Sequence, residues 1–449
     1  MPSQGYLQAD WRREAIRTNL WVVPAAEAFV VLVLFGGTYA VDRTAYHGDL
    51  HLPSWVLSGT ADSARQILTA VAAAVITVVG IVFSITIVAL TLASTQFGPR
   101  MLRNFIRDRG TQLTLGTFVA TFFYTILTLV SVGSGSAGDF VPHLSITVAL
   151  VLTLGDLAML IYFLNHIASV IQLPQVIAGI ARDLAREIDA QGGGEGSFGV
   201  GAARGPSSAE LLHRIDESGA AIRTPSSGYL QVIRHDTLLK IASSADAVIH
   251  LPYRPGHFLV RGQILASVWP AEAAEYVERN LQHGHVTGPY RTLTQDISFG
   301  FDQLVEIALR ALSPAVNDTF TAMTCIDWLG DCLCRISTTW HPQRVRRDTT
   351  GHIRVITSQA DFDRLVERTF EKIRQAADGM PAVMIRQLDA VTKIVEQTPD
   401  SARRRILRDQ ADMIQRANLR TVQELADRAD VTARYDAVVE VLDGDLHPR

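Results

Sequence analysis

The feature that most constrains this chain is a run of 32 residues, 66–97, without one charged side chain. A helix needs about 20 residues to cross the roughly 30 Å hydrocarbon core of a bilayer. Three more apolar stretches of similar length lie at 21–41, 112–133 and 143–165. We therefore expect a cytoplasmic segment over residues 1–20, followed by a four-helix transmembrane domain over residues 21–172.

Basic residues are distributed unevenly between the loops that join these stretches. They gather in the N-terminal segment and in the loop between the second and third spans: Arg12, Arg13, Arg17, Arg100, Arg103, Arg107 and Arg109. The loop between the third and fourth spans has none. Loops rich in Lys and Arg stay on the cytoplasmic side. The pattern predicts a multi-pass protein of the inner (plasma) membrane with both termini in the cytoplasm.

The remaining residues are charged and mostly helical in pattern, which predicts a cytoplasmic α+β region. Its expected parts are an exit helix (173–190), a flexible Gly/Ser linker (191–209), a small β-module (227–269) and a helical domain (270–449). Gly/Ser-rich chain buries too little apolar surface to offset the entropy of ordering. In the β-module, RPGHFLVRGQILASV resembles half of a biotinyl/lipoyl-like barrel-sandwich domain without its carrier lysine. This predicts a β-sandwich with no prosthetic group.

Three motifs resemble one family over most of the chain. They are TLASTQFGPRMLRNFIRDRGTQLTLGTFVATFFYTILTLV, GYLQVI with YRPGHFLVRGQ, and TQDISFGFDQLVEIALRALSPAVNDTFTAMTCIDWL. These are similar to an uncharacterised bacterial family of predicted membrane proteins, domain of unknown function 2254. The resemblance implies a multi-pass inner-membrane protein and brings no activity, substrate or catalytic residue.

Hydroxyl side chains recur at helical spacing along the second and third spans. The two stripes are Thr77, Ser84, Thr91 and Thr95, and Thr117, Thr121, Tyr124, Thr128 and Ser131. Ala70, Ala73 and Gly80 lie near the first stripe. Small and hydroxyl residues are enriched where membrane helices pack, but such a face also suits a hydrated pathway. The sequence leaves both interpretations open.

Two acids interrupt the apolar spans, and acids inside a membrane are costly and often functional. Glu27 lies near the start of the first span and Asp156 lies within the fourth. At 1.5 Å per residue they sit roughly 10 and 14 Å from the inner end, close enough to face each other. Glu27 could instead pair with Arg17, and Asp156 could form an interhelical hydrogen bond. His166, ten residues after Asp156, could extend a proton or cation relay, or be an ordinary interfacial histidine.

Two further groups have alternative interpretations. Arg100, Arg103 and Arg107 share one helical face, which suits contact with anionic lipid of the cytoplasmic leaflet or a basic pore mouth. Pro314, Asn317 and Asp318 suit helix punctuation, and with Glu306 they could also bind a ligand or cation.

Several functional classes have little support. The formal net charge of −4 argues against a nucleic-acid partner. Cys332 and Cys334 have the wrong spacing for a zinc knuckle, and we expect no metal or cofactor. No phosphate-binding loop or nucleophile elbow is present, so we expect no enzyme.

The stripes, the acids and the large cytoplasmic region together favour a homo-oligomeric ion channel or channel-like transporter. In that interpretation the second and third spans line the path and the cytoplasmic region assembles or gates it. The alternative is a non-conducting scaffold or sensor that binds a protein or small ligand.

Overall fold

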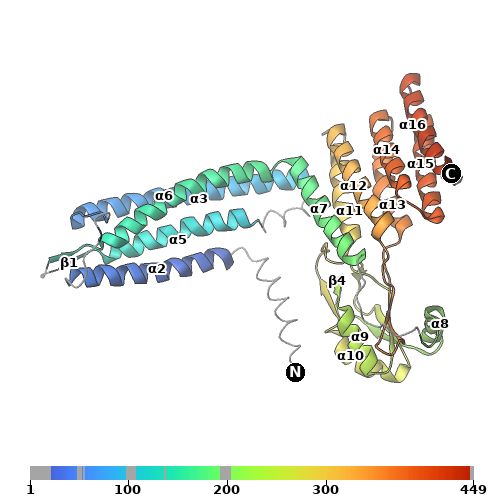
Figure 1. Cartoon of the computed structure of the whole chain (residues 1–449), viewed down its shortest axis with the longest axis horizontal. Coiled ribbons are helices and arrows are strands. Elements are labelled where there is room, and N and C mark those ends of the chain that lie inside the picture. The colour runs from blue at the N-terminus through green and yellow to red at the C-terminus, as the bar shows by residue number, and fades with distance from the viewer. Residues whose placement is uncertain are drawn as a thin grey trace. The chain divides into compact units, whose positions relative to one another are not determined.

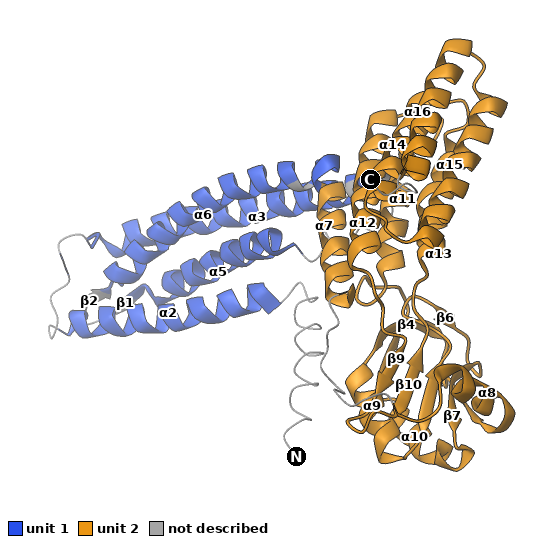
Figure 2. Cartoon of the chain, turned by 45° about the vertical axis from the view of Figure 1, so that its right-hand side comes forward, with its two compact units in different colours: residues 1–175 blue, residues 176–449 orange. Residues whose placement is uncertain are grey.

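The computed structural model describes residues 22–47, 53, 56–97, 108–135, 138–192 and 204–444. The chain divides into two compact units, residues 1–175 and 176–449 (Figure 2). The expected fold class is confirmed: four long apolar helices precede an α+β region with small sheets and C-terminal helices.

The four apolar helices are each long enough to cross a membrane. They are α2 (Val22–Tyr46), α3 (Ala61–Phe97), α5 (Arg109–Ser131) and α6 (His143–Val170). Helix α3 begins five residues before the uncharged run because the Thr60 hydroxyl accepts the Ser63 N–H at 3.3 Å. Such a side-chain cap satisfies one of the free N–H groups of a helix start.

Helix α5 occupies the centre of this bundle and contacts α2, α3 and α6 (Figure 1). Its aromatic side chains Phe118 and Tyr124 are buried among apolar residues of these neighbours. A hairpin of β1 (Gly133–Gly135) and β2 (Gly138–Phe140) connects α5 to α6. By contrast, α2 and α3 leave broad apolar faces exposed, as membrane helices do toward lipid.

The second unit begins within α7 (Leu173–Gly192). The β-module has two sheets, accompanied by three helices and one 3-10 turn between residues 204 and 290. These are α8 (Ser208–Ser218), α9 (His235–Ser244), η2 (Ala271–Ala273) and α10 (Ala274–Leu281). The strands are β3 (Ala220–Arg223), β4 (Gly228–Ile233), β5 (Val248–Leu251), β6 (Phe258–Leu259), β7 (Ile264–Trp269), β8 (His285–Gly288), β9 (Val345–Arg347) and β10 (Ile353–Thr357).

This β-module is larger than expected and is not a barrel-sandwich. One sheet has the order β3-β7-β5-β10-β9 and includes a parallel pair, β5 with β10; the other has the order β6-β4-β8. Strands β8, β9 and β10 come from the region 270–449, so the expectation of a wholly helical domain there is wrong. The reason is that β10 buries Val355 in the module's core, a pairing across about a hundred residues of sequence.

The rest of that region forms helices arranged side by side (Figure 1). They are α11 (Ile297–Ala311), α12 (Thr319–Thr339), α13 (Phe362–Ala376), α14 (Pro381–Glu396), α15 (Ser401–Thr421) and α16 (Leu425–Gly444). In α13 the apolar residues at helical spacing, among them Leu365 and Phe370, are buried, as expected for a core-facing stripe.

Candidate functional site

A row of polar side chains runs along one face of α5 through the transmembrane bundle. Its members follow a three-four spacing, which places them on one side of a helix, and we call them the α5 seam: Thr114, Thr117, Thr121, Tyr124 and Thr128. All but Thr117 are buried. Thr114, Thr117 and Thr128 donate to backbone carbonyls four residues earlier, whereas Thr121 and Tyr124 bind side chains of other helices. Interhelical contacts of the seam are made by Thr121 and Tyr124, and by Thr117 with Glu27 of α2.

Asp156 of α6 meets the seam at its midpoint. The Thr121 hydroxyl donates to Asp156 Oδ1 at 3.1 Å. Asp156 is only 4% exposed, and its Oδ2 has no hydrogen-bond partner among the described residues. A buried carboxylate oxygen without a donor is costly in a medium of low polarity. The arrangement suits a group that exchanges a proton or a cation, or that accepts a water.

Glu27 of α2 meets α5 near the Arg109 end. Its Oε2 lies only 2.1 Å from the position that a Cβ on Gly116 would occupy. The Glu27 carboxylate also contacts the Thr117 hydroxyl. Glu27 Oε2 is also buried without a partner in the described part of the chain. Glu27 and Asp156 thus both face α5, about 8 Å apart along its axis at 1.5 Å per residue.

Each end of the seam has a hydrogen-bonded polar cluster. At one end, His166 Nε2 lies 2.7 Å from Asp108 Oδ2, and the same oxygen accepts the Thr111 N–H at 2.7 Å. At the other end, Tyr124 and Thr38 share a hydrogen bond of 2.8 Å between their hydroxyls. Ser131 donates to the Thr128 carbonyl rather than to a neighbouring helix.

Asp42 completes that second cluster. It is 3% exposed and accepts three hydrogen bonds, from the Leu144 N–H (2.8 Å), the Ser145 N–H (2.9 Å) and the Ser145 hydroxyl (2.7 Å). The Asp42 carboxylate therefore caps the first turn of α6 from α2. Sequence reasoning placed Asp42 in a loop, because its partners lie about a hundred residues away and no local pattern reveals them.

The stripe on α3 does not join the α5 seam. Thr77, Ser84 and Thr91 are exposed, on the opposite side of α3 from the buried Leu68, Val75 and Val82. Thr77 and Thr91 donate to their own helix, to the carbonyls of Ala73 (2.7 Å) and Ile87 (2.9 Å). The two stripes thus face different surroundings within one chain.

Some of the expected site residues lie outside what the structure describes. These are Arg100, Arg103 and Arg107, together with the side chain of Thr95.

The segment from Pro314 to Asp318 separates α11 from α12. Asp318 is the N-cap of α12 and accepts the Thr321 N–H at 3.0 Å and the Thr321 hydroxyl at 2.6 Å. These hydrogen bonds lower the pKa of Asp318. Asn317 has a left-handed backbone, φ 51°, which shapes the turn. The cap uses both carboxylate oxygens, so the geometry is that of helix punctuation.

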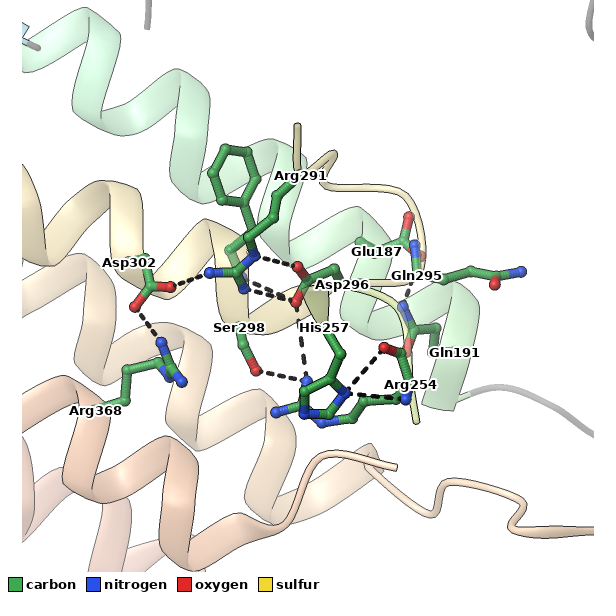
Figure 3. A network of polar contacts seen from close by, with 11 residues as sticks. Glu187, Gln191, Arg254, His257, Arg291, Gln295, Asp296, Ser298, Asp302 and Arg368 are labelled. Carbon is green, nitrogen blue, oxygen red and sulfur yellow. Dashed lines mark hydrogen bonds and ion pairs between the residues drawn. The ribbon is translucent and has the colours of Figure 1, made fainter. Parts of the chain in front are cut away.

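A second polar network, which sequence reasoning missed, lies in the α+β region (Figure 3). Asp296 is 1% exposed and accepts two hydrogen bonds from Arg291, at 2.8 and 3.0 Å, in a bidentate pair. Arg291 also donates to Asp302 at 2.6 Å, and Arg368 of α13 pairs with the same carboxylate. Arg254 donates to Ser298 at 3.2 Å. We call this set the Asp296 latch.

The latch joins the β-module to the helices. Asp296 lies where a Cβ on Gly256 would be, and Gly256 has a φ of 96°, so the Arg254–His257 turn can approach closely only with glycine. Gln295 extends the connection: its side chain hydrogen-bonds the Ile233 N–H and carbonyl of β4, and its own N–H donates to Glu187 of α7 at 2.8 Å. The pKa of Arg254 is lowered by burial and by the neighbouring arginines, although Asp296 opposes this.

No cluster of His, Cys, Asp or Glu with the geometry of a metal site occurs in the described ranges. His250, His257 and His285 have lowered pKa values, chiefly because of burial. Burial also raises the pKa of Cys332 to about 12 and that of Cys334 to about 11, so both are protonated at neutral pH.

Four membrane-length apolar helices with a polar seam, joined to an α+β region, define a multi-pass membrane protein. The chain belongs to the family described as predicted membrane protein (DUF2254), whose model matches residues 17–393. This confirms the family expected from the three sequence motifs.

Its relatives include an uncharacterised protein of Mycobacterium bovis and two of Mycobacterium tuberculosis. Each is 30% identical over 457 residues, which cover 97% of this chain and 84% of the relative. No solved structure matches the chain.

Proposed function

We propose that this protein moves ions across the bacterial inner membrane as a channel or channel-like transporter, along the α5 seam. The observation that carries the proposal is the pair of acids, Glu27 and Asp156, that face α5 inside the bundle with one unpaired oxygen each in the described structure. Acids held inside a membrane in this way are typical of proton and cation pathways.

Polar side chains of the other helices meet α5 at four successive positions. The successive contacts on α5 are His166 at Gly110, Glu27 at Gly116, Asp156 at Thr121 and Thr38 at Tyr124. At 1.5 Å per residue the intervals along the axis are about 9, 8 and 5 Å. Intervals of this size are bridged by one or two waters that hydrogen-bond the flanking groups. A hydrated chain of acids and hydroxyls favours protons or small cations over anions.

The basic loops support an orientation with both termini in the cytoplasm. In that orientation the Asp108–His166 pair lies at the inner end of the seam and Asp42 at the outer end. The α+β region is then cytoplasmic, where it assembles or gates the bundle, and Arg100, Arg103 and Arg107 meet anionic lipid. The exposed small-residue face of α3 supports assembly of several copies.

Proton flux into proteoliposomes tests the proposal. A potassium gradient with valinomycin imposes a voltage, and a trapped pH-sensitive dye reports proton entry. We expect flux from the unmodified protein and at least a tenfold loss for Asp156→Asn and for Glu27→Gln. The matched control is Thr44→Val, because Thr44 is exposed on α2 and its hydroxyl donates to the Val41 carbonyl of its own helix.

Potassium, sodium and proton gradients applied separately identify the ion. If the unmodified protein carries no ion under any voltage, pH or membrane tension, the translocation proposal is wrong.

The alternative, a non-conducting scaffold or sensor, has one observation in its favour. Most hydroxyls of α3 and α5 donate to carbonyls of their own helix, and Asp42 is fully used as a cap. In that case the seam packs helices, and the α+β region binds a protein or small ligand. Absence of flux combined with unchanged folding of Asp156→Asn would favour it.

A further inference from the structure

The turn between α11 and α12 exposes apolar side chains to an unusual degree. Phe320 is 78% exposed and Val316 is 55% exposed, and Pro314 and Ala315 beside them are exposed as well. Phe320 is more exposed than Phe29 (66%), which lies on the outer face of the apolar helix α2. Exposed apolar side chains gathered in one short turn suit contact with a membrane or with another protein. We call residues 313–320 the α11–α12 tip.

Hydrogen bonds hold the tip in this shape. The Asn317 N–H donates to the Ser313 carbonyl at 2.9 Å, and the Asp318 N–H donates to the Ala311 carbonyl at 2.8 Å. Both Asp318 carboxylate oxygens accept from Thr321. The polar groups of the turn are therefore satisfied by the turn itself, and the side chains that point outward are the apolar ones.

The tip lies at the end of the α+β region where the chain enters from the fourth apolar helix. Leu184 of α7 contacts Gly300 of α11, and Glu187, further along α7, accepts from Gln295, just before α11. Helices α7 and α11 therefore run in opposite directions. At 1.5 Å per residue, the tip and the start of α7 lie about 20 and 16 Å from that contact, toward the same end.

The short connection between α6 and α7 limits how far the start of α7 can lie from the bilayer. Helix α6 ends at Val170 and α7 begins at Leu173, so two residues separate them. Two residues span about 7 Å when fully extended. The start of α7, beside which the tip lies, is therefore connected by a short segment of chain to an apolar helix of membrane-crossing length.

The size and charge of the surface decide between possible occupants. A stable contact with a second copy needs about 800 Å² from each partner, which two exposed side chains do not supply. The α15–α16 turn also exposes an apolar residue, Leu425, but two acids, Glu424 and Asp427, flank it and disfavour an anionic lipid surface. The tip has one acid, Asp318, and both of its carboxylate oxygens accept hydrogen bonds from Thr321. We propose that the α11–α12 tip inserts Val316 and Phe320 into the headgroup boundary of the membrane that holds the apolar helices.

Spin labels on introduced cysteines test this contact in the full-length protein. Val316→Cys and Phe320→Cys place labels on the tip, and Ser401→Cys is the matched control. Ser401 is exposed and starts α15 at the opposite end, because Arg403 two residues later donates to the Ile336 and Ser337 carbonyls near the end of α12. The native cysteines are buried and protonated, so labelling is directed to the new thiols.

In liposomes of phosphatidylglycerol and phosphatidylethanolamine, we expect labels at 316 and 320 to collide more with oxygen and at least threefold less with a nickel chelate than the label at 401. Equal nickel accessibility at 316, 320 and 401 would overturn the proposal.

Two further measurements separate lipid insertion from other causes. Phe320→Asp should bring the label at 316 back to the accessibility of position 401, which distinguishes insertion from local folding. Dilution of the protein in lipid should leave the protection unchanged. Protection that disappears on dilution would show contact between copies and would also overturn the proposal.

Discussion

At the scale of single residues, buried carboxylates of the bundle differ in how completely they are hydrogen-bonded. Asp42 accepts three hydrogen bonds and caps α6, whereas Asp156 accepts one and keeps an oxygen without a partner in the described structure. A saturated acid stabilises the fold, since removing it would expose three donors. An unsaturated acid in the same environment costs stability.

His235 provides a residue-scale prediction about pH in the β-module. Burial, reinforced by the charge of Arg346, lowers the pKa of His235 from 6.5 to about 4. The unfolded chain therefore takes up this proton first, and stability should fall as pH decreases from 6.5 toward 4. We expect a loss of about 2 kcal/mol between pH 7.5 and pH 5 from this residue.

Guanidinium unfolding of the full-length protein in detergent, followed by tryptophan fluorescence, measures that loss. His235→Gln keeps a polar side chain and removes the titration, so its stability should change less with pH than that of the unmodified protein. The same pH dependence in both proteins would contradict the assigned pKa.

At the scale of elements, the close approach of α2 to α5 depends on one glycine. A Cβ on Gly116 would lie 2.1 Å from Glu27 Oε2 and 3.0 Å from the Pro24 Cα. The carboxylate can rotate away, but the backbone of α2 cannot yield without moving the helix. Overpacking of this kind costs typically about 1–3 kcal/mol. We predict that Gly116→Ala lowers the unfolding temperature in detergent.

Gly155 of α6 is the matched control, because nothing lies within 4 Å of the Cβ that would be added there. Alanine is favoured over glycine in helices by about 1 kcal/mol, so Gly155→Ala should be neutral or stabilising. The double variant Gly116→Ala/Glu27→Ala should recover only part of the loss, since the Pro24 contact remains. Equal unfolding temperatures for the two single variants would argue against a close α2–α5 contact.

The elements that sequence could predict are those with local signals. The four apolar helices and α13 have long hydrophobic patterns, and these determine their existence with little help from the rest of the chain. Strands β9 and β10 have three and five residues, and the parallel pairing of β10 with β5 is a long-range contact that no local pattern encodes. The same holds for the site. Thr121 and Asp156 were visible as polar residues in apolar helices, whereas the Asp296 latch depends on three separate segments.

At the scale of the whole molecule, the latch gives the β-module a mechanical connection to α7. Gln295 binds both β4 and α7, and Asp296 next to it binds Arg291 and receives the Arg254–His257 turn. Breaking a buried ion pair by removing one partner typically costs about 3–5 kcal/mol. The β-module is therefore connected by hydrogen bonds and ion pairs to the helix that follows the last apolar span in sequence.

The exposed face of α3 leads to the last prediction, on assembly. Ala73, Thr77, Gly80 and Ser84 are exposed at helical spacing, and nothing lies within 4 Å of the Cβ that would be added at Gly80. Faces of small residues allow close contact between membrane helices. Gly80→Leu fits within one chain, so any effect must come from a neighbour. We expect an oligomer of the unmodified protein and at least a tenfold weaker association for Gly80→Leu.

Single-molecule photobleaching of labelled protein in liposomes, at two lipid-to-protein ratios, counts the copies. Gly155→Leu is the control, since Gly155 is equally open within one chain but lies on α6. Loss of association in Gly155→Leu but not in Gly80→Leu would move the interface to α6. If neither variant nor the unmodified protein associates, one chain alone must supply the pathway. In that case the α5 seam is the polar route that the described helices provide. The face of small residues on α3 then lies against lipid.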